Sequence, residues 1–342
     1  MESLLFFATG ASSGVGLEAT RQLAVHLSRQ QQEEPNRNNS NSDGSNNQVV
    51  ATIYLLCRSK EKTQAAIEDI YNSIGENSSN AKNNIKLNFL KFDACDDAET
   101  IVNNIQFNNA TKIAGVLLNA GGFGENATGI DKNIKSKTSG SSSNIAKLNI
   151  IGHVILVNHL LSVGKTDAST RIVAAGSEAS FVTQGLSIHA YNAADFEAHL
   201  SSSLGSGKMA IGTEYAWTKG ILALYWAAFA RHHPEVFVTT VSPGAVSDTQ
   251  LLSNVPFFLR TLARLSQWSC LGGSHTVQEG AKRYVNALIN DIPVGSSGSF
   301  LASRKGFAQD FGDVSSLSKC QFVSDIELQD KAWKAVHNSL ER

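Results

Sequence analysis

The sequence lacks several features that would assign it to a specialised class of protein. Its formal net charge is only -1 in 342 residues, and no run of lysine or arginine marks a nucleic-acid-binding surface. Its four cysteines, at positions 57, 95, 270 and 320, show no paired spacing. We therefore expect reduced thiols in a reducing compartment, the cytoplasm, rather than a disulfide framework.

No apolar run has the length of a membrane span or the form of a signal peptide. The nearest candidate, at 220–230, is shorter than the roughly 18–20 residues that a membrane span needs. The apolar run at 4–8 has no cationic segment before it and leads directly into a glycine-rich turn, which favours a strand. With 42% hydrophobic residues, the chain has the composition of an ordinary globular protein.

Strand-like and helix-like segments alternate along the whole chain. Short apolar runs predict strands buried on both faces at 4–8, 49–56, 85–92, 115–118, 171–175 and 237–241, with a short last strand at 299–302. Helical periodicity predicts helices between them, among others at 60–74, 144–160, 277–289 and 326–340. Without a break in composition, this alternation predicts one α/β domain over 1–342, a doubly wound Rossmann-type fold with a mostly parallel sheet flanked by helices.

Polar stretches interrupt the alternation three times. Residues 31–48, 76–84 and 124–143 have too few apolar side chains to form a core, so we expect surface insertions. By contrast, 251–275 contains an aromatic and apolar stretch. We expect it to form a lid over an apolar pocket, although plain core packing would explain it equally well.

A glycine-rich turn follows the first predicted strand. Gly10, Gly14 and Gly16 have the spacing Gly-x-x-x-Gly-x-Gly, and helical periodicity begins at Leu17. A strand, a glycine-rich turn and a helix form the arrangement in which backbone N–H groups and a helix N-terminus bind the pyrophosphate of a dinucleotide. A tight turn without a ligand remains the alternative.

The end of the second predicted strand carries the residue that we expect to select the cofactor. An acidic residue there would bind the 2′-hydroxyl of NAD, whereas an arginine accommodates the 2′-phosphate of NADP. Here Cys57 is followed by Arg58, which favours NADP, although a surface charge at a helix start would also explain Arg58. At the end of the third strand, Asp93 could accept a hydrogen bond from adenine, and Asp96 is expected to cap the next helix.

Tyr215 and Lys219 are four residues apart in a segment that reads as helix, so their side chains share one face. A fixed positive charge beside a tyrosine lowers the pKa of its phenol. Tyr215 could then exchange a proton near neutral pH as a general acid or base. Such a pair is common in helices, so its meaning depends on the segments that precede it.

Taken in order, these segments resemble the short-chain dehydrogenase/reductase family. The matching stretches cover roughly residues 3–250: Thr9-Gly10-x-x-x-Gly14-x-Gly16, Asp93, Asn119-Ala120-Gly121, the stretch from Leu148 to His153, the stretch from Arg171 to Ser177, Tyr215-x-x-x-Lys219 and Pro243-Gly244. The part from 251 onward is similar to the retinol-dehydrogenase and protochlorophyllide-reductase-like branch.

The resemblance implies roles for the matching residues. Tyr215 would exchange the proton with the substrate oxygen, and Lys219 would lower the pKa of Tyr215 and hold the nicotinamide ribose. Ser177 would orient the carbonyl, and Asn149 would anchor a water that links Lys219 to solvent. No metal is implied. The residues expected to border the cofactor NADP(H) are Gly10, Ser12, Ser13, Gly14, Val15, Gly16, Arg58, Asp93, Asn119, Ala120, Gly121, Tyr215, Lys219, Pro243, Gly244, Val246 and Thr249.

The implied function is an NADP(H)-dependent oxidoreductase that interconverts a carbonyl and an alcohol on an apolar substrate by hydride transfer. Two alternatives stay open: a non-catalytic NADP-binding regulatory protein, and a reductase of a carbon–carbon double bond in a large planar substrate. The cysteine that follows the active-site lysine in the protochlorophyllide branch has no counterpart at 221–223, which counts against a photoreductase.

Two further features concern the entrance to the substrate-binding site and the oligomeric state. Ser177 and Tyr215 are much further apart than is usual in the family, which predicts an insertion beside the substrate mouth. The all-apolar helices around Ile151 and Leu224 could form the helix-pair homodimer common in the family. The same pattern would serve a monomer in which insertions cover them.

Overall fold

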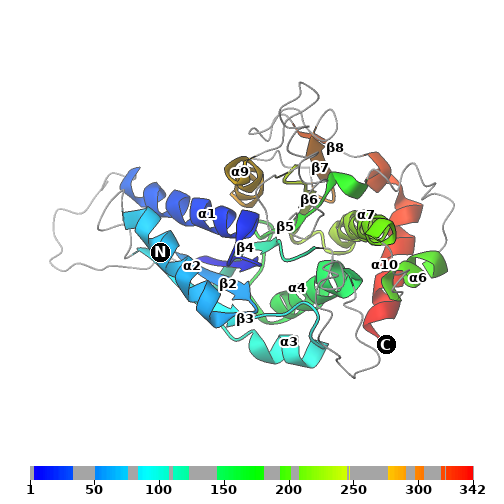
Figure 1. Cartoon of the computed structure of the whole chain (residues 1–342), viewed down its shortest axis with the longest axis horizontal. Coiled ribbons are helices and arrows are strands. Elements are labelled where there is room, and N and C mark those ends of the chain that lie inside the picture. The colour runs from blue at the N-terminus through cyan, green and yellow to red at the C-terminus, as the bar shows by residue number, and fades with distance from the viewer. Residues whose placement is uncertain are drawn as a thin grey trace.

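The computed structural model describes the chain in segments: residues 4–33, 51–75, 84–107, 111–122, 145–180, 193–201, 208–244, 246, 276–289, 297–303, 317–319 and 321–341. Most of the three predicted insertions, the whole predicted lid at 251–275 and the predicted cofactor residue Thr249 lie outside the described residues. The described residues form one sheet with helices packed on both of its faces (Figure 1).

Eight strands form the sheet, in the order β3-β2-β1-β4-β5-β6-β7-β8. Their bounds are β1 Leu4–Thr9, β2 Ala51–Cys57, β3 Ile85–Lys91, β4 Lys112–Leu118, β5 Arg171–Ala175, β6 Phe237–Val241, β7 Phe300–Ser303 and β8 Leu317–Lys319. The pairs from β3 to β7 are all parallel, and β8 runs antiparallel to β7. The predicted doubly wound, mostly parallel sheet is confirmed, and its strand order reverses between β1 and β4.

Two cores lie on opposite faces of the sheet because successive side chains of a buried strand point to opposite sides. Phe6 and Ala8 of β1 pack with α1 (Gly14–Glu33), α2 (Lys60–Gly75) and α9 (Val277–Leu288). Leu5 and Phe7 belong to the other core. The helices on that side are α3 (Ala98–Asn104), α4 (Gly152–Val163), α6 (Ala193–Ser201), α7 (Lys208–His232) and α10 (Ile326–Leu340).

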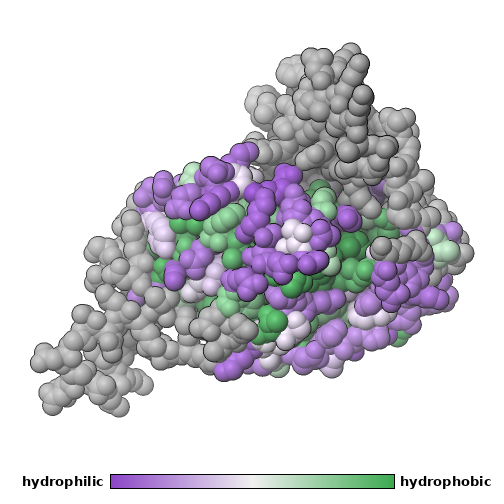
Figure 2. Space-filling view, turned by 90° about the horizontal axis from the view of Figure 1, so that it is seen from below, coloured by the Kyte–Doolittle hydropathy of each residue, from purple (hydrophilic) through white to green (hydrophobic). Residues whose placement is uncertain are grey.

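The apolar helix α7 is covered within a single chain. Every residue from 214 to 229 is buried. The C-terminal helix α10 packs along α7, and α6 packs against both (Figure 1). Trp333 of α10 stacks on Tyr225 of α7, with ring centroids 5.3 Å apart. Figure 2, seen from below the view of Figure 1, shows a face on which the described residues are mostly hydrophilic, with hydrophobic ones between them.

Several sequence predictions of local structure need correction. Helix α1 continues to Glu33, so the first residues of the predicted insertion at 31–48 are helical. Asp97 rather than Asp96 caps α3, because its carboxylate accepts the N–H of Thr100 at 2.8 Å. Neither strand β8 nor helix α6 was predicted from the sequence. A π-helical turn at Lys147–Ile151 replaces the regular helix predicted there.

Candidate active site

The glycine-rich turn joins β1 to α1 and is pressed against the turn that follows β4. Gly10 and Gly14 have φ angles of 65° and 56°, a left-handed conformation that favours glycine. At Gly16 a Cβ would lie 2.3 Å from the side-chain nitrogen of Asn119. That Asn119 amide donates to the carbonyl of Thr9 at 3.3 Å. A Cβ at Gly10 would lie 3.0 Å from the Cα of Ala120, so contacts inside the protein already require Gly10 and Gly16 to be small.

The same turn has the features of a pyrophosphate site. Helix α1 begins at Gly14, and the first N–H groups of a helix have no partners within it. The positive end of the helix dipole lies at the same place. Ser13 is exposed and Ser12 half-buried, while Val15 is buried beneath them. The residues predicted to hold a dinucleotide therefore fit its diphosphate in conformation and in accessible donors.

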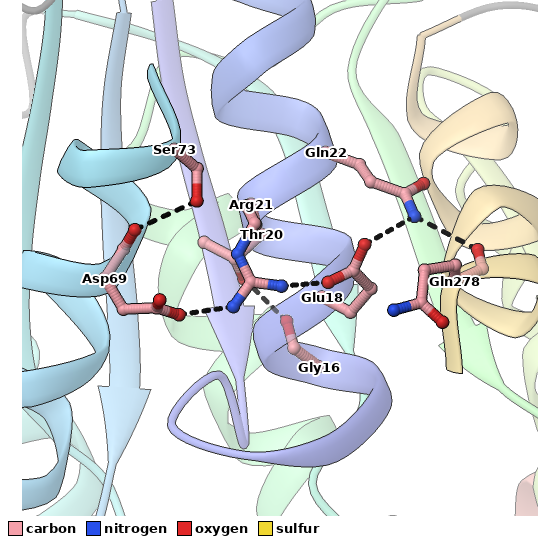
Figure 3. Close-up of polar contacts among 8 residues, drawn as sticks. All are labelled: Gly16, Glu18, Thr20, Arg21, Gln22, Asp69, Ser73 and Gln278. Atoms are coloured by element: carbon pink, nitrogen blue, oxygen red, sulfur yellow. Dashed lines mark hydrogen bonds and ion pairs between the residues drawn. The ribbon is translucent and has the colours of Figure 1, made fainter. Parts of the chain in front are cut away.

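Polar side chains on both sides of α1 hold it in place (Figure 3). Arg21 forms ion pairs with Glu18, one turn earlier, and with Asp69 of α2. On the other side, Gln22 donates to the carbonyl of Gln278 of α9 at 3.0 Å. The helix that carries the glycine-rich turn is thus linked to both of its neighbours on this face of the sheet.

The residues predicted for the adenosine end follow the ends of β2 and β3. Arg58 is exposed directly after β2, and its backbone carbonyl accepts a hydrogen bond from the Lys91 ammonium at 2.8 Å. Asp93 follows β3, and its carboxylate accepts the N–H of Cys95 at 3.0 Å. The backbone N–H of Gly10 donates to Leu56 of β2 at 2.9 Å. The structure therefore places Arg58, Asp93 and the glycine-rich turn at the same edge of the sheet.

A buried asparagine holds the turn after β4. The Asn149 oxygen accepts the N–H of Gly122 at 3.1 Å, and its amide donates to the Gly122 carbonyl at 2.8 Å. The amide also donates to Ile145 at 2.9 Å. Asn149 is fully buried in the π-helical turn, a feature that often marks functional sites. A Cβ at Gly121 would lie 2.6 Å from the Asn149 oxygen and 3.5 Å from the Lys219 ammonium, so these three residues meet.

Thr9 and His153 are not among the residues for which the sequence predicts a role. The Thr9 hydroxyl accepts the N–H of Ala120 at 2.9 Å and lies 3.2 Å from Nε2 of His153. The imidazole is buried and stacks on Phe92, with ring planes 8° apart. Burial, helped by the charge of Lys219, lowers the pKa of His153 to about 3. A neutral His153 thus joins the end of β1, the turn after β4 and α4. The only sequence signal was its place in the matched stretch at 148–153.

Tyr215 and Lys219, in the first half of α7, meet Ser177 just after the end of β5. Tyr215 and Lys219 are both buried, and the Tyr215 phenol hydrogen-bonds to the side chain of the half-buried Ser177. The Lys219 ammonium donates to the carbonyl of Ala175 at 2.8 Å and lies 5.7 Å from the centre of the Tyr215 ring. The structure therefore brings together all four residues that the sequence predicted to be catalytic, with Asn149 beside Lys219.

Burial, rather than the neighbouring charge, dominates the ionisation of this cluster. Burial raises the pKa of Tyr215 to about 12, although the hydrogen bond from Ser177 acts to lower that pKa. It also lowers the pKa of Lys219 to about 8. The predicted lowering of the Tyr215 pKa is thus wrong in direction, because the phenolate loses more hydration than its neighbours restore. At neutral pH the phenol keeps its proton.

A third turn, after β6, completes this edge of the sheet. Gly244 has a φ angle of 80°, and its N–H donates to the Ser242 hydroxyl at 3.1 Å. The fully buried Arg283 of α9 donates to the carbonyl of Ser242 at 3.1 Å. Gly280 of the same helix is small enough for Pro243 and Val246 to pack against it. The predicted residues Pro243, Gly244 and Val246 therefore lie in one turn that α9 supports.

Two kinds of feature are absent from the described part of the chain. It holds no group of three or more histidine, cysteine or carboxylate side chains that could bind a metal ion. None of its helices combines the length and the apolar character that crossing a bilayer requires.

Comparison with solved structures identifies the fold. Salutaridine reductase from Papaver somniferum is 20% identical, with a TM-score of 0.57 over 87% of this chain and 99% of its own. A short-chain dehydrogenase/reductase from Brucella melitensis is 17% identical, with a TM-score of 0.55 over 87% and 93% of the two chains. A single-residue variant of the actinorhodin polyketide ketoreductase, solved with NADPH, is 15% identical, with a TM-score of 0.52 over 84% and 91%.

At such low identities, the likeness is one of fold. No protein-family model matches the chain, and no curated protein does. The chain has the fold of the short-chain dehydrogenases/reductases, and the resemblance predicted from its ordered motifs is confirmed at that level.

Proposed function

We propose that this protein is an NADP(H)-dependent oxidoreductase of the short-chain dehydrogenase/reductase family that reduces a carbonyl group on an apolar substrate. The convergence of Ser177, Tyr215 and Lys219 at the carboxyl edge of the sheet carries the proposal. In open α/β sheets, ligands bind outside this edge, near the point where the strand order reverses. The glycine-rich turn lies there as well, after β1.

The chain's own residues would hold the cofactor along this edge. The turn from Gly10 to Gly16 would bind the diphosphate, and Arg58 the 2′-phosphate of the adenosine. Asp93 would meet the adenine ring, and the turn from Asn119 to Gly121 the adenosine side. Pro243, Gly244 and Val246, with Thr249 beyond them, would border the nicotinamide. When bound, NADPH supplies the hydride, and the protein supplies orientation and the proton.

The proton chemistry follows from burial. With a pKa of about 12, the phenol of Tyr215 is protonated at neutral pH and can donate its proton to a carbonyl oxygen. The Ser177 hydroxyl would hydrogen-bond to the same oxygen and orient it. Lys219 would bind the nicotinamide ribose, and Asn149 beside it would connect the ammonium to solvent through a water. In this form the phenol is the proton donor that reduction of a carbonyl requires.

The neighbouring structures and the packing of α7 support other parts of the proposal. Two of the similar structures are reductases by name, and one of these is described with NADPH. The apolar nature of the substrate rests on the aromatic stretch at 251–275. The sequence left a homodimer and a monomer open for the apolar helices. Because α6 and α10 cover α7, the packing supports the monomer.

Replacing Tyr215 by phenylalanine tests the proposal. We expect NADPH oxidation with a panel of apolar aldehydes and ketones to fall by roughly 10²–10⁴-fold, the contribution typical of a positioned general acid. The dissociation constant for NADPH, measured by fluorescence titration, should stay within about twofold, since phenylalanine keeps the ring of Tyr215 and every other residue expected to border the cofactor is unchanged.

A matched control lies on the same helix. Tyr225 is fully buried, and its hydroxyl has no hydrogen-bond partner in the described structure. Tyr225→Phe should therefore leave turnover unchanged. Undiminished turnover in Tyr215→Phe would exclude Tyr215 as the proton donor. NADPH binding without turnover of any panel compound would favour the regulatory alternative.

A further inference from the structure

A second cation lies beside Arg58 at the adenosine end of the candidate site. Lys91 is the last residue of β3 and pairs in register with Cys57, the residue before Arg58. Its ammonium donates to the backbone carbonyl of Arg58 at 2.8 Å. Both side chains are exposed. The Lys91 ammonium therefore lies across the end of β2, at the position where the sequence predicts the 2′-phosphate of NADP.

The hydrogen bond to Arg58 does not explain why this residue is a lysine. An exposed carbonyl can be hydrated by water, so a lysine is not needed to satisfy it. The ammonium also has three N–H donors, of which the carbonyl takes one. Two donors are left for a ligand at the outer edge of the sheet.

The charges around Lys91 favour an anion of high charge. Arg58, Lys60 and Lys91 are all exposed at the ends of β2 and β3. The charge of Lys91 acts on the carboxylates of Asp96 and of Glu61, which accepts the Ser59 hydroxyl at 2.9 Å. A phosphate monoester carries about -1.5 to -2 charges at neutral pH. One arginine would leave roughly half of that charge uncompensated, and a second cation would balance it.

We propose that Lys91 is a second cation of an adenosine 2′-phosphate subsite, and that it acts with Arg58 to select NADP(H) over NAD(H). The proposal rests on the proposed function in that it takes the site to bind a dinucleotide. It adds a specificity residue from β3, whereas the sequence argument placed the selection of the cofactor at the end of β2 alone.

The test compares Lys91→Met with Lys86→Met. Methionine keeps most of the length of the side chain and removes its charge. Lys86 is exposed on the same strand, five residues earlier, and so lies roughly 16 Å away toward the amino end. Dissociation constants are measured by calorimetry for 2′,5′-ADP, 5′-AMP, NADPH and NADH, and none of these measurements depends on turnover.

The expected result is selective. Lys91→Met should weaken the binding of 2′,5′-ADP and NADPH by about tenfold or more, and leave 5′-AMP and NADH within about twofold. Lys86→Met should change none of the four constants. Lys91→Arg should retain most of the preference for NADPH, because it keeps the charge. Added salt should reduce the difference in NADPH affinity between the wild type and Lys91→Met, since the subsite is exposed and salt screens its charges.

Two outcomes would overturn the proposal while leaving the proposed function intact. If the binding of NADPH and of NADH weakened equally, Lys91 would only stabilise the end of β2 through its hydrogen bond to the Arg58 carbonyl. Unchanged binding of all four ligands would mean that Lys91 does not contact the 2′-phosphate. A wild-type protein that binds none of the four ligands would instead refute the dinucleotide site itself, and the proposed function with it.

Discussion

The two ends of the candidate cofactor site are built in different ways. At the adenosine end, Arg58 and Lys91 are exposed side chains at the ends of neighbouring strands. At the nicotinamide end, Asn149, Tyr215 and Lys219 are buried, and Asn149 and Lys219 bind backbone groups 27 and 44 residues away. Substitutions at the exposed end can therefore change the ligand preference with little effect on the fold. Substitutions at the buried end are expected to change both the chemistry and the stability of the protein.

The physical reason is desolvation. An exposed charge keeps most of its hydration, so its removal changes stability little. A buried polar group depends on its protein partners, and losing one leaves the full desolvation penalty of the other, about 1–3 kcal/mol. The same penalty shifts the pKa values of Tyr215, Lys219 and His153. Substitutions can test this contrast by their effects on the free energy of unfolding.

The largest loss of stability is expected for Asn149→Leu. The substitution keeps the side chain's approximate size but leaves the buried N–H and carbonyl of Gly122 without their partner. We expect the free energy of unfolding to fall by about 2–4 kcal/mol, since the two Gly122 groups and the carbonyl of Ile145 each lose a hydrogen bond. Urea denaturation followed by tryptophan fluorescence measures this change.

Asn158 provides the control because it is exposed on α4, close to Asn149 in sequence. Asn158→Leu should change stability by no more than about 0.5 kcal/mol. Equal effects of the two substitutions would show that the Asn149 amide adds no more to stability than a surface amide, and the contrast between the two ends would be lost.

A smaller effect, visible only in its pH dependence, is expected at His153. Its folded-state pKa of about 3 lies below the unfolded value near 6.5. Between these pH values the unfolded chain binds a proton that the folded chain excludes. Stability from this residue is therefore complete above about pH 6.5 and falls as the pH drops toward 3, by up to about 1.4 kcal/mol per pH unit.

Replacing His153 by phenylalanine removes that titration and keeps a ring that can stack on Phe92. The variant need not match the wild type at pH 8, because it also loses the contact with Thr9. The test is the slope: between pH 6.5 and 4.5, the variant should lose less stability per pH unit than the wild type. Parallel pH profiles would show that His153 protonates in the folded protein as readily as in the unfolded chain.

Much of the fold could be predicted from local sequence because local sequence determines it. The bounds predicted for β5, β6 and α10 agree with the structure, since each is an apolar run or an amphipathic period with clear ends. Strand β8 has three residues and is held by its pairing with β7, so it left no apolar pattern to recognise. Asp96 and Asp97 are adjacent, and only the backbone geometry decides which of them caps α3.

The residues of the candidate site could be predicted from the sequence, but their burial, their pKa values and some of their contacts could not. The order of the motifs predicted that Ser177, Tyr215 and Lys219 act together, and these side chains lie together in the structure. The pKa of Tyr215 could not be predicted from its spacing to Lys219, because it depends on burial by segments far away in the sequence. The contact between Thr9 and His153 spans 144 residues, and no local pattern announces it.

The smallest effect is expected for the exposed ion pair between Arg21 of α1 and Asp69 of α2 (Figure 3). Arg21 is 26% exposed and Asp69 is 53% exposed, so water screens their attraction. A double-mutant cycle with Arg21→Gln and Asp69→Asn should give a coupling energy of about 0.2–1 kcal/mol that decreases with added salt. Arg21 also pairs with Glu18, so the single Arg21 substitution should cost more than that of Asp69. A salt-independent coupling above about 2 kcal/mol would mean that this exposed pair is held as strongly as the buried groups, and exposure would then not explain the contrast.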